Sequence, residues 1–113
     1  MYIAMNRFRI ASGRGDEFEE IWRRRESHLE DVPGFREFHL LRGPADEEAT
    51  LYASHAVWES REAFEAWTHS EAFRKAHARA RAPEGMHLGP PRFEGFAVVL
   101  GDTSGEAGEA GSD

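Results

Sequence analysis

Three polar side chains fall at positions where the local sequence pattern predicts an orientation toward the protein interior: Asn6, Trp67 and His77. An amide, an indole N–H and an imidazole all form hydrogen bonds in water, and a buried group left without a partner costs about 1–3 kcal/mol. We therefore expect a cavity in which these side chains meet a polar ligand. Imidazole also binds metal ions, so metal-dependent chemistry in that cavity is one hypothesis.

Asn6 belongs to a segment in which every second residue shares one orientation. The residues in register with it are mostly apolar, namely Tyr2, Ala4, Phe8 and Ile10. Such an alternation is typical of a half-buried strand and sends Asn6 to the apolar face. The amide could instead bond a backbone carbonyl near the strand edge, which would be a purely structural role.

His77 and Trp67 each occupy an apolar helix face. His77 has the i, i+3, i+4, i+7 spacing together with Phe73, Ala76 and Ala80, and the small alanines leave room beside the ring for a flat ligand. Neutral imidazole is a ligand of heme iron, although a single inward histidine can also be a hydrogen-bonded core residue. Trp67 can likewise be explained by core packing alone.

Arg25 interrupts an apolar helical stripe formed by Phe18, Trp22, Leu29 and Val32. One interpretation is that its aliphatic stem packs on the apolar surface while the guanidinium reaches water. The other is that it binds an anion at the mouth of the cavity, where a carboxylate is the strongest partner for a guanidinium.

The elements that would position these residues alternate along the chain. We predict strands over Tyr2–Ile10, Phe35–Arg42, Thr50–Trp58 and Phe93–Leu100, helices over Asp16 to about Asp31, Ser60–Trp67 and Thr68 to about Arg81, and a Pro- and Gly-rich loop over Ala82–Pro91. Thr68 and Glu71 have the spacing of a capping box for the third helix. The βαββαβ order predicts an α+β, ferredoxin-like fold with helices on one face of an antiparallel sheet.

The second face of that sheet would remain uncovered in a single chain. The third strand is apolar on both sides, with Leu51, Ala53 and Val57 on one and Tyr52, Ala56 and Trp58 on the other. We therefore expect a homodimer in which this face packs on its own copy and forms a dimeric α+β barrel.

Length and composition limit the possible classes of protein. The chain has 113 residues, which is the usual size of one domain. We expect this domain over residues 1–100 and a disordered, acidic, Gly-rich tail over residues 101–113. A net charge of −7 argues against nucleic acid as a partner, and no apolar run is long enough for a membrane span. The absence of cysteine excludes thiolate chemistry and is typical of a cytoplasmic protein.

Several motifs together resemble a known family. They are Asn6 in the first strand, Pro33-Gly34-Phe35 before the second, His55-Ala56-Val57-Trp58-Glu59-Ser60, Glu62-Ala63-Phe64-Glu65-Ala66-Trp67, and Ala76-His77-Ala78. From Tyr2 to Leu100 the chain resembles the IsdG-type heme-degrading monooxygenases of the antibiotic biosynthesis monooxygenase superfamily. The Pro-Gly-Phe and Trp-Glu-Ser elements indicate the fold, and the Asn, Trp and His trio is the specific part of the resemblance.

The resemblance implies a catalytic set and a cofactor. Heme would be both cofactor and substrate, with His77 as the ligand of its iron, Asn6 as a hydrogen-bond donor on the opposite side of the ring, and Trp67 pressing the macrocycle out of plane. Arg25 would contact a heme propionate. The reaction would consume dioxygen and electrons from an external donor, and the loop over Ala82–Pro91 would act as a lid.

Two other functions remain open from the sequence. Related superfamily members that lack the trio are cofactor-free monooxygenases, which oxidise aromatic or small signalling substrates without a metal. A protein that binds or sequesters heme without degrading it would need the same pocket residues. The remaining histidines are interpreted as surface or structural residues, and these are His28, His39, His55, His69 and His87.

Overall fold

The computed structural model describes residues 1–25, 29–74 and 83–102. They form a four-stranded antiparallel sheet in the order β2-β3-β1-β4. The elements are β1 Tyr2–Ala11, α1 Gly15–Arg24, the 3-10 turn η1 Leu29–Asp31, β2 Phe35–Ala45, β3 Ala49–Trp58, α2 Arg61–Thr68 and β4 Arg92–Ala97. This is the predicted ferredoxin-like α+β fold, and the strand order is the one that the split βαββαβ pattern requires.

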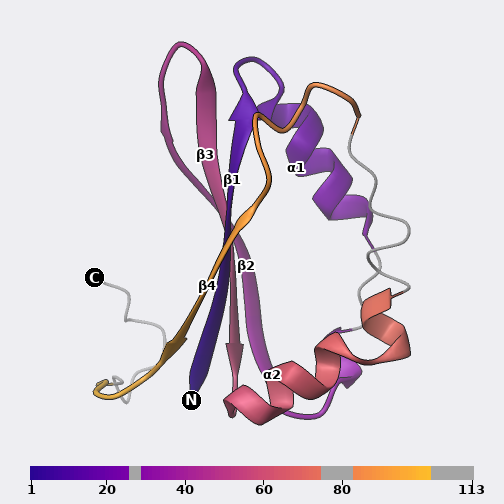
Figure 1. Ribbon diagram of the computed structural model, residues 1–113, viewed down its shortest axis with the longest axis vertical. Helices are drawn as coiled ribbons and strands as arrows, with labels where there is room; N and C mark the ends of the chain where they lie inside the picture. The colour runs from indigo at the N-terminus through magenta and orange to yellow at the C-terminus, as the bar shows by residue number, and fades with distance from the viewer. Residues whose placement is uncertain (26–28, 75–82, 103–113) are drawn as a thin grey trace.

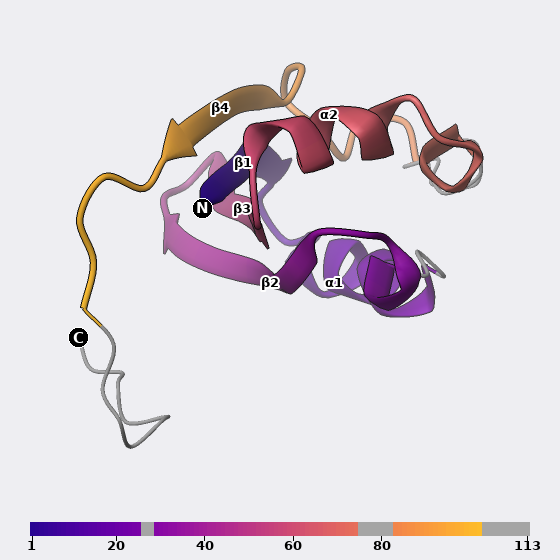
Figure 2. The same ribbon diagram turned by 90° about the horizontal axis from the view of Figure 1, so that it is seen from below.

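Both helices lie on the same side of the sheet. Viewed from below in Figure 2, α2 lies toward the β4 edge and α1 toward the β2 edge, while Figure 1 shows α1 at the upper and α2 at the lower end of the strands. The predicted alternation of β1 is confirmed, since Ala4, Phe8 and Ile10 are buried beneath the helices and Arg7 and Arg9 are exposed on the other face. The helices therefore enclose a space over the inner face of β1.

The first helix is shorter than the sequence pattern predicts. It ends at Arg24, because Arg25 has extended backbone angles of φ −72° and ψ 135°. Leu29 is buried from a separate 3-10 turn instead of from the same helix.

The connection from η1 to β2 depends on the backbone freedom of Gly34. Its φ is +86°, and a Cβ atom placed there would lie 2.5 Å from the Ala63 Cβ of α2. The carbonyl of Gly34 also accepts a hydrogen bond from the Glu59 N–H at 2.8 Å. The Pro-Gly-Phe motif thus brings the start of β2 against the start of α2.

The caps of the second helical region differ in part from the prediction. Ser60 caps α2 as predicted, its Oγ accepting from the Ala63 N–H at 3.1 Å. The Thr68 capping box is wrong, because the Thr68 hydroxyl donates to the Glu65 carbonyl and Ser70 Oγ accepts from the Phe73 N–H instead. Residues 71–74 are helical, and the rest of the predicted helix to Arg81 lies outside the described residues.

Two strands have bounds that differ from the predicted ones. Strand β2 continues to Ala45, beyond the predicted end at Arg42, since Ala45 pairs with Thr50 after a register shift. Strand β4 ends at Ala97 and not at Leu100, because the ladder with β1 ends where Ala97 faces Tyr2 at the start of β1. The predicted tail lies outside the described residues from residue 103 onward.

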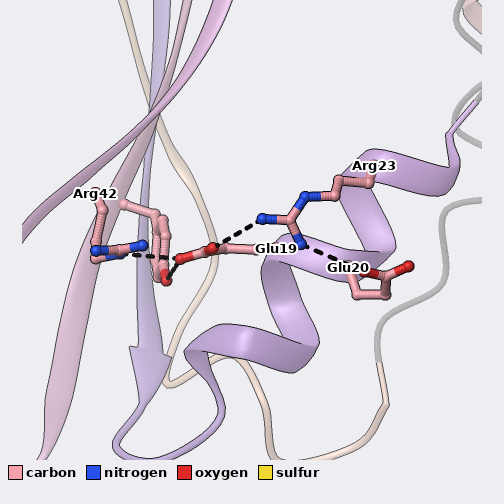
Figure 3. A network of polar contacts seen from close by, with 5 residues as sticks. Glu19, Glu20, Arg23 and Arg42 are labelled. Atoms are coloured by element: carbon pink, nitrogen blue, oxygen red, sulfur yellow. Dashed lines mark hydrogen bonds and ion pairs between the residues drawn. The ribbon is translucent and has the colours of Figure 1, made fainter.

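A polar network fastens α1 to the sheet (Figure 3). The Glu19 carboxylate accepts hydrogen bonds from the Tyr52 hydroxyl at 2.5 Å and the Arg42 Nε at 2.9 Å, and it lies 3.4 Å from Arg23. These hydrogen bonds, first from Arg42 and then from Tyr52, hold the pKa of Glu19 below its usual value. The network fixes the distance between α1 and the β2–β3 hairpin.

Candidate functional site

A cavity of about 560 Å³ lies between the inner face of the sheet and the helices. Its size is within the range of small-molecule and cofactor sites, roughly 300–1,000 Å³. Most of its lining is apolar, and much of that is aromatic. The lining residues are Ala4, Asn6, Phe8, Phe18, Ile21, Trp22, Arg25, Leu29, Phe38, Ser54, Ala56, Trp58, Phe64, Trp67, Thr68, Phe73, His87, Pro91 and Phe93.

Three of the four residues predicted for the site line this one cavity. Asn6, Arg25 and Trp67 come from the first strand, the end of the first helix and α2 respectively. The fourth, His77, lies outside the described residues. Phe73, which the sequence pattern assigns to the same helix face as His77, lines the cavity. The inward position of His77 stays a prediction, and the position of Phe73 supports it.

Asn6 lies in the middle of the sheet wall. It is directly opposite Ser54 on β3 and Phe93 on β4. Among the described residues, no protein group forms a hydrogen bond with its side-chain amide. The alternative prediction, in which the amide bonds a nearby backbone carbonyl, therefore does not hold within the described residues. The amide is therefore available to a ligand in the cavity.

Arg25 is a cation without a carboxylate partner among the described residues. Its guanidinium carbon lies 4.1 Å from the centre of the Trp22 ring, and its Nε is buried with no hydrogen-bond partner in the part of the chain that the structure describes. Burial lowers the pKa of Arg25, yet a guanidinium remains protonated at all physiological pH values. A half-buried guanidinium of this kind is stabilised by an anion, so the cavity is suited to a ligand that carries a carboxylate.

Trp67 is part of a continuous aromatic wall. Its ring lies 5.4 Å from that of Trp58 and 4.8 Å, edge to face, from that of Phe73. On the adjoining side, Phe64 stacks on Phe93 with 6° between the planes. Flat, rigid rings of this kind favour a flat apolar ligand, because they contact it over a large area and lose little conformational entropy.

The sequence analysis did not assign three polar lining residues to the site: Ser54, Thr68 and His87. Ser54 is buried on the inner face opposite Asn6, and its place between Tyr52 and Ala56 in the alternation of the third strand would have identified it. His87 also lines the cavity, so of the two predicted interpretations, surface or structural, the surface one does not hold. Nothing local in its loop predicts this orientation, since it depends on a long-range pairing with Ile10 of β1.

The other histidines lie away from the cavity where the structure describes them. His39 and His69 are exposed, and the His69 Nδ1 lies 3.1 Å from the Glu65 carbonyl. His55 is half-buried on the outer sheet face opposite Met5. These three agree with the surface interpretation, whereas His28 lies outside the described residues.

Comparisons with known proteins agree with this architecture. A family model described as antibiotic biosynthesis monooxygenase matches residues 1–79. A heme oxygenase (mycobilin-producing) of Mycobacterium tuberculosis is 39% identical over 98 residues, which are 87% of this chain and 89% of the relative.

Solved structures show the same likeness. The structure of the heme-degrader MhuD from Mycobacterium tuberculosis, with two hemes bound in its active site, superposes with a TM-score of 0.71 at 35% identity over 90% of this chain and 99% of that one. SnoaB, a cofactor-independent oxygenase from Streptomyces nogalater, has a TM-score of 0.63 at 21% identity over 88% of this chain and 95% of its own, which is a likeness of fold. The chain belongs to the antibiotic biosynthesis monooxygenase family, as the sequence motifs predicted.

Proposed function

We propose that this protein is a heme-degrading monooxygenase that binds heme as both cofactor and substrate, opens the porphyrin ring by oxidation and releases the iron. The observation that carries the proposal is a cavity with aromatic walls that is lined by a half-buried arginine, whose buried Nε has no hydrogen-bond partner among the described residues. The similar heme oxygenase and the similar structure of a heme-degrader support the same reaction class.

The residues present fit a heme. The macrocycle is flat and apolar, which suits a cavity walled by the tilted and edge-to-face rings of Trp58, Trp67 and Phe64. Its propionates are carboxylates, and Arg25 offers the guanidinium that would neutralise one of them. The amide of Asn6, on the sheet wall, is free to donate a hydrogen bond toward the centre of the cavity.

Each predicted site residue has a distinct task in this proposal. Bound heme would supply a redox-active iron and an oxidisable ring. His77 would hold the iron from the helix side, while the Asn6 side-chain N–H would donate from the sheet side and orient what binds there. Trp67 would press on the plane of the ring, and the surrounding aromatic side chains would exclude water from the reacting carbon.

The co-reactants and the assembly are further parts of the proposal. Oxidative ring opening consumes dioxygen and needs electrons, and we propose that an external reductant supplies them. We also propose a homodimer through the outer sheet face, where Leu41 and Phe96 are 43% and 47% exposed. Arg7 of that face pairs within its own chain with Glu94 at 3.1 Å.

The cellular location also stays a proposal. Within the described residues, no helix is long and apolar enough to cross a membrane. The absence of cysteine suits a reducing compartment, and we propose the cytoplasm.

One experiment separates this function from its alternatives. The purified protein is titrated with hemin while the Soret band is followed, and ascorbate is then added in air. The proposed function requires a Soret shift, then bleaching and release of iron that a chelator detects. A stable shift without bleaching would identify a heme carrier, and the absence of any shift would favour a cofactor-free monooxygenase.

A further inference from the structure

His87 is held at the inner face of the sheet by backbone hydrogen bonds on both sides. The Ala11 N–H donates to the Met86 carbonyl at 2.8 Å, and the Leu88 N–H donates to the Arg9 carbonyl at 2.9 Å. His87 itself faces Ile10 in an antiparallel bridge. Residues paired in this way have side chains on the same face of the sheet, and Ile10 is fully buried beneath the helices, so the His87 ring is directed into the molecule.

The ring lies at one end of the cavity. It packs against Phe8 and Phe18 with centroid distances of 5.9 and 5.7 Å, and these two rings belong to the core cluster around Tyr52 and Met86. Trp67 belongs to the separate cluster around Trp58 and Leu29. His87 and Trp67 therefore belong to different parts of the lining of the same cavity.

The two ring nitrogens of His87 have different surroundings. Nδ1 is buried with no hydrogen-bond partner among the described residues, so a proton on it would be an orphaned buried donor, which proteins avoid more strictly than an orphaned acceptor. The favoured neutral tautomer carries its proton on Nε2. Because His87 lines the cavity, Nε2 is the nitrogen left to meet a ligand there, and it does so as a donor.

A role as iron ligand is disfavoured by the same observation. A histidine that binds a metal through one nitrogen almost always donates its other N–H to a carboxylate, a carbonyl or water, which fixes the ring and raises its basicity. In the part of the chain that the structure describes, the Nδ1 of His87 has no such acceptor. The chemistry that remains is a neutral N–H donor at the end of an apolar cavity, which is suited to an acceptor oxygen.

We propose that the Nε2–H of His87 donates a hydrogen bond to a carboxylate oxygen of the bound macrocycle, and that His87 and Arg25 together determine how the macrocycle is rotated within the cavity. This inference rests on the proposed heme function, because the propionates are the oxygen-bearing groups of heme. Arg25, at the end of α1, lines the same cavity as His87. Two donors at different positions of the lining select one rotational setting of an otherwise nearly symmetric ring.

The test compares hemin with hemin dimethyl ester, whose carboxylates are blocked. In the His87→Phe variant the aromatic contacts to Phe8 and Phe18 are kept and the donor is lost. We expect this variant to bind hemin roughly tenfold to a hundredfold more weakly than the wild type, as for loss of a hydrogen bond to a charged group. Its affinity for the dimethyl ester should be close to that of the wild type, which also shows that the cavity is intact.

Two further variants complete the design. His87→Gln retains an N–H donor and should recover part of the affinity for hemin, and it replaces the Phe variant if that protein does not fold. His39→Phe is the matched control, because His39 is exposed on the other face of the sheet and should bind hemin as the wild type does.

The outcomes separate this inference from the proposed function. If the wild type binds no hemin, both are overturned. If the wild type binds hemin and Arg25→Met weakens binding while His87→Phe does not, only the assignment of His87 is overturned. A loss of the histidine-ligated spectrum in His87→Phe would also overturn it, because His87 would then be an iron ligand and not a donor.

Discussion

At the scale of single residues, the cavity has two features that are rarely found together in a purely structural protein core. Its walls are aromatic and rigid, yet Asn6, Arg25 and His87 present polar groups that no described protein atom satisfies. A protein core would lose about 1–3 kcal/mol for each such group. Retaining them is understandable if a ligand supplies the missing partners, and each residue then makes a separate contribution that substitution can isolate.

Arg25→Met should separate ligand binding from folding. It removes the charge and keeps the stem that packs beside Trp22, so we expect hemin affinity to fall roughly tenfold to a hundredfold. The melting temperature without ligand should be unchanged or higher, since the substitution removes a buried Nε–H that has no partner among the described residues. Hemin titration and thermal denaturation measure the two effects. Arg24→Met is the control, because that side chain is 79% exposed, and a similar loss of affinity there would contradict the role of Arg25.

Asn6→Ala should retain hemin binding and lose turnover. The amide would act on what binds opposite the iron ligand, so its removal affects the reaction more than the complex. Single-turnover bleaching with ascorbate, measured beside the Soret titration, tests this. Loss of binding and turnover together would indicate a structural role for the amide.

For Trp67 we expect the Phe variant to keep partial activity and the Ala variant to lose it, because the bulk of the ring would distort the macrocycle.

At the scale of secondary-structure elements, the cavity depends on how closely the helices are held to the sheet. Gly34 determines this at α2 and Glu19 at α1, and the two positions use different physics. Gly34 acts through backbone conformation and steric space. Glu19 acts through charged hydrogen bonds, so the attachment of α1 depends on pH.

Gly34→Ala should be strongly destabilising, by about 2–4 kcal/mol, because a left-handed φ and a clash with Ala63 add together. Gly13→Ala is a matched control, since Gly13 has a φ of +85° but nothing within 4 Å of an added Cβ. We expect it to cost only about 1 kcal/mol, the price of the conformation alone. Urea denaturation measures both values, and equal losses would show that the contact with Ala63 is unimportant.

Glu19→Gln should remove part of the acid sensitivity of the fold. The pKa of Glu19 is lowered in the folded state, by hydrogen bonds from Arg42 and then Tyr52, so the ionised form contributes stability above the unfolded-state pKa of about 4.3. That contribution is lost as the pH falls from there through the folded-state pKa. The stability difference between wild type and variant should therefore be largest near neutral pH and shrink below about pH 4. A difference that is constant across this range would contradict the assignment.

At the scale of the whole molecule, one face of the sheet is covered by helices and the other is not. The outer face carries Ile3, Met5, Leu41 and Phe96, of which the last two are well exposed. An exposed apolar sheet face is an interaction site or an aggregation hazard. A second copy of the chain would cover it symmetrically, as we propose.

Leu41→Glu should convert the proposed dimer to a monomer. The substitution places a charge on the outer side of the edge strand β2, and a symmetric dimer would bury it twice, so its cost is doubled. Sedimentation velocity of wild type and variant measures the change. The control is Arg42→Ala at the next position, whose side chain points to the other side of the strand and bonds Glu19. A wild type that sediments as a monomer would refute the dimer.

The sequence by itself determined the types of the elements, their βαββαβ order and the inner face of β1, because alternation and helical spacing are local consequences of backbone geometry. It also identified Asn6, Trp67 and Arg25, each of which breaks a local apolar pattern. Only the tertiary structure decided where α1 ends, since that depends on the contacts made by Leu29. It alone revealed His87, whose orientation arises from a pairing with Ile10 that spans most of the chain and leaves no periodic signal in the sequence.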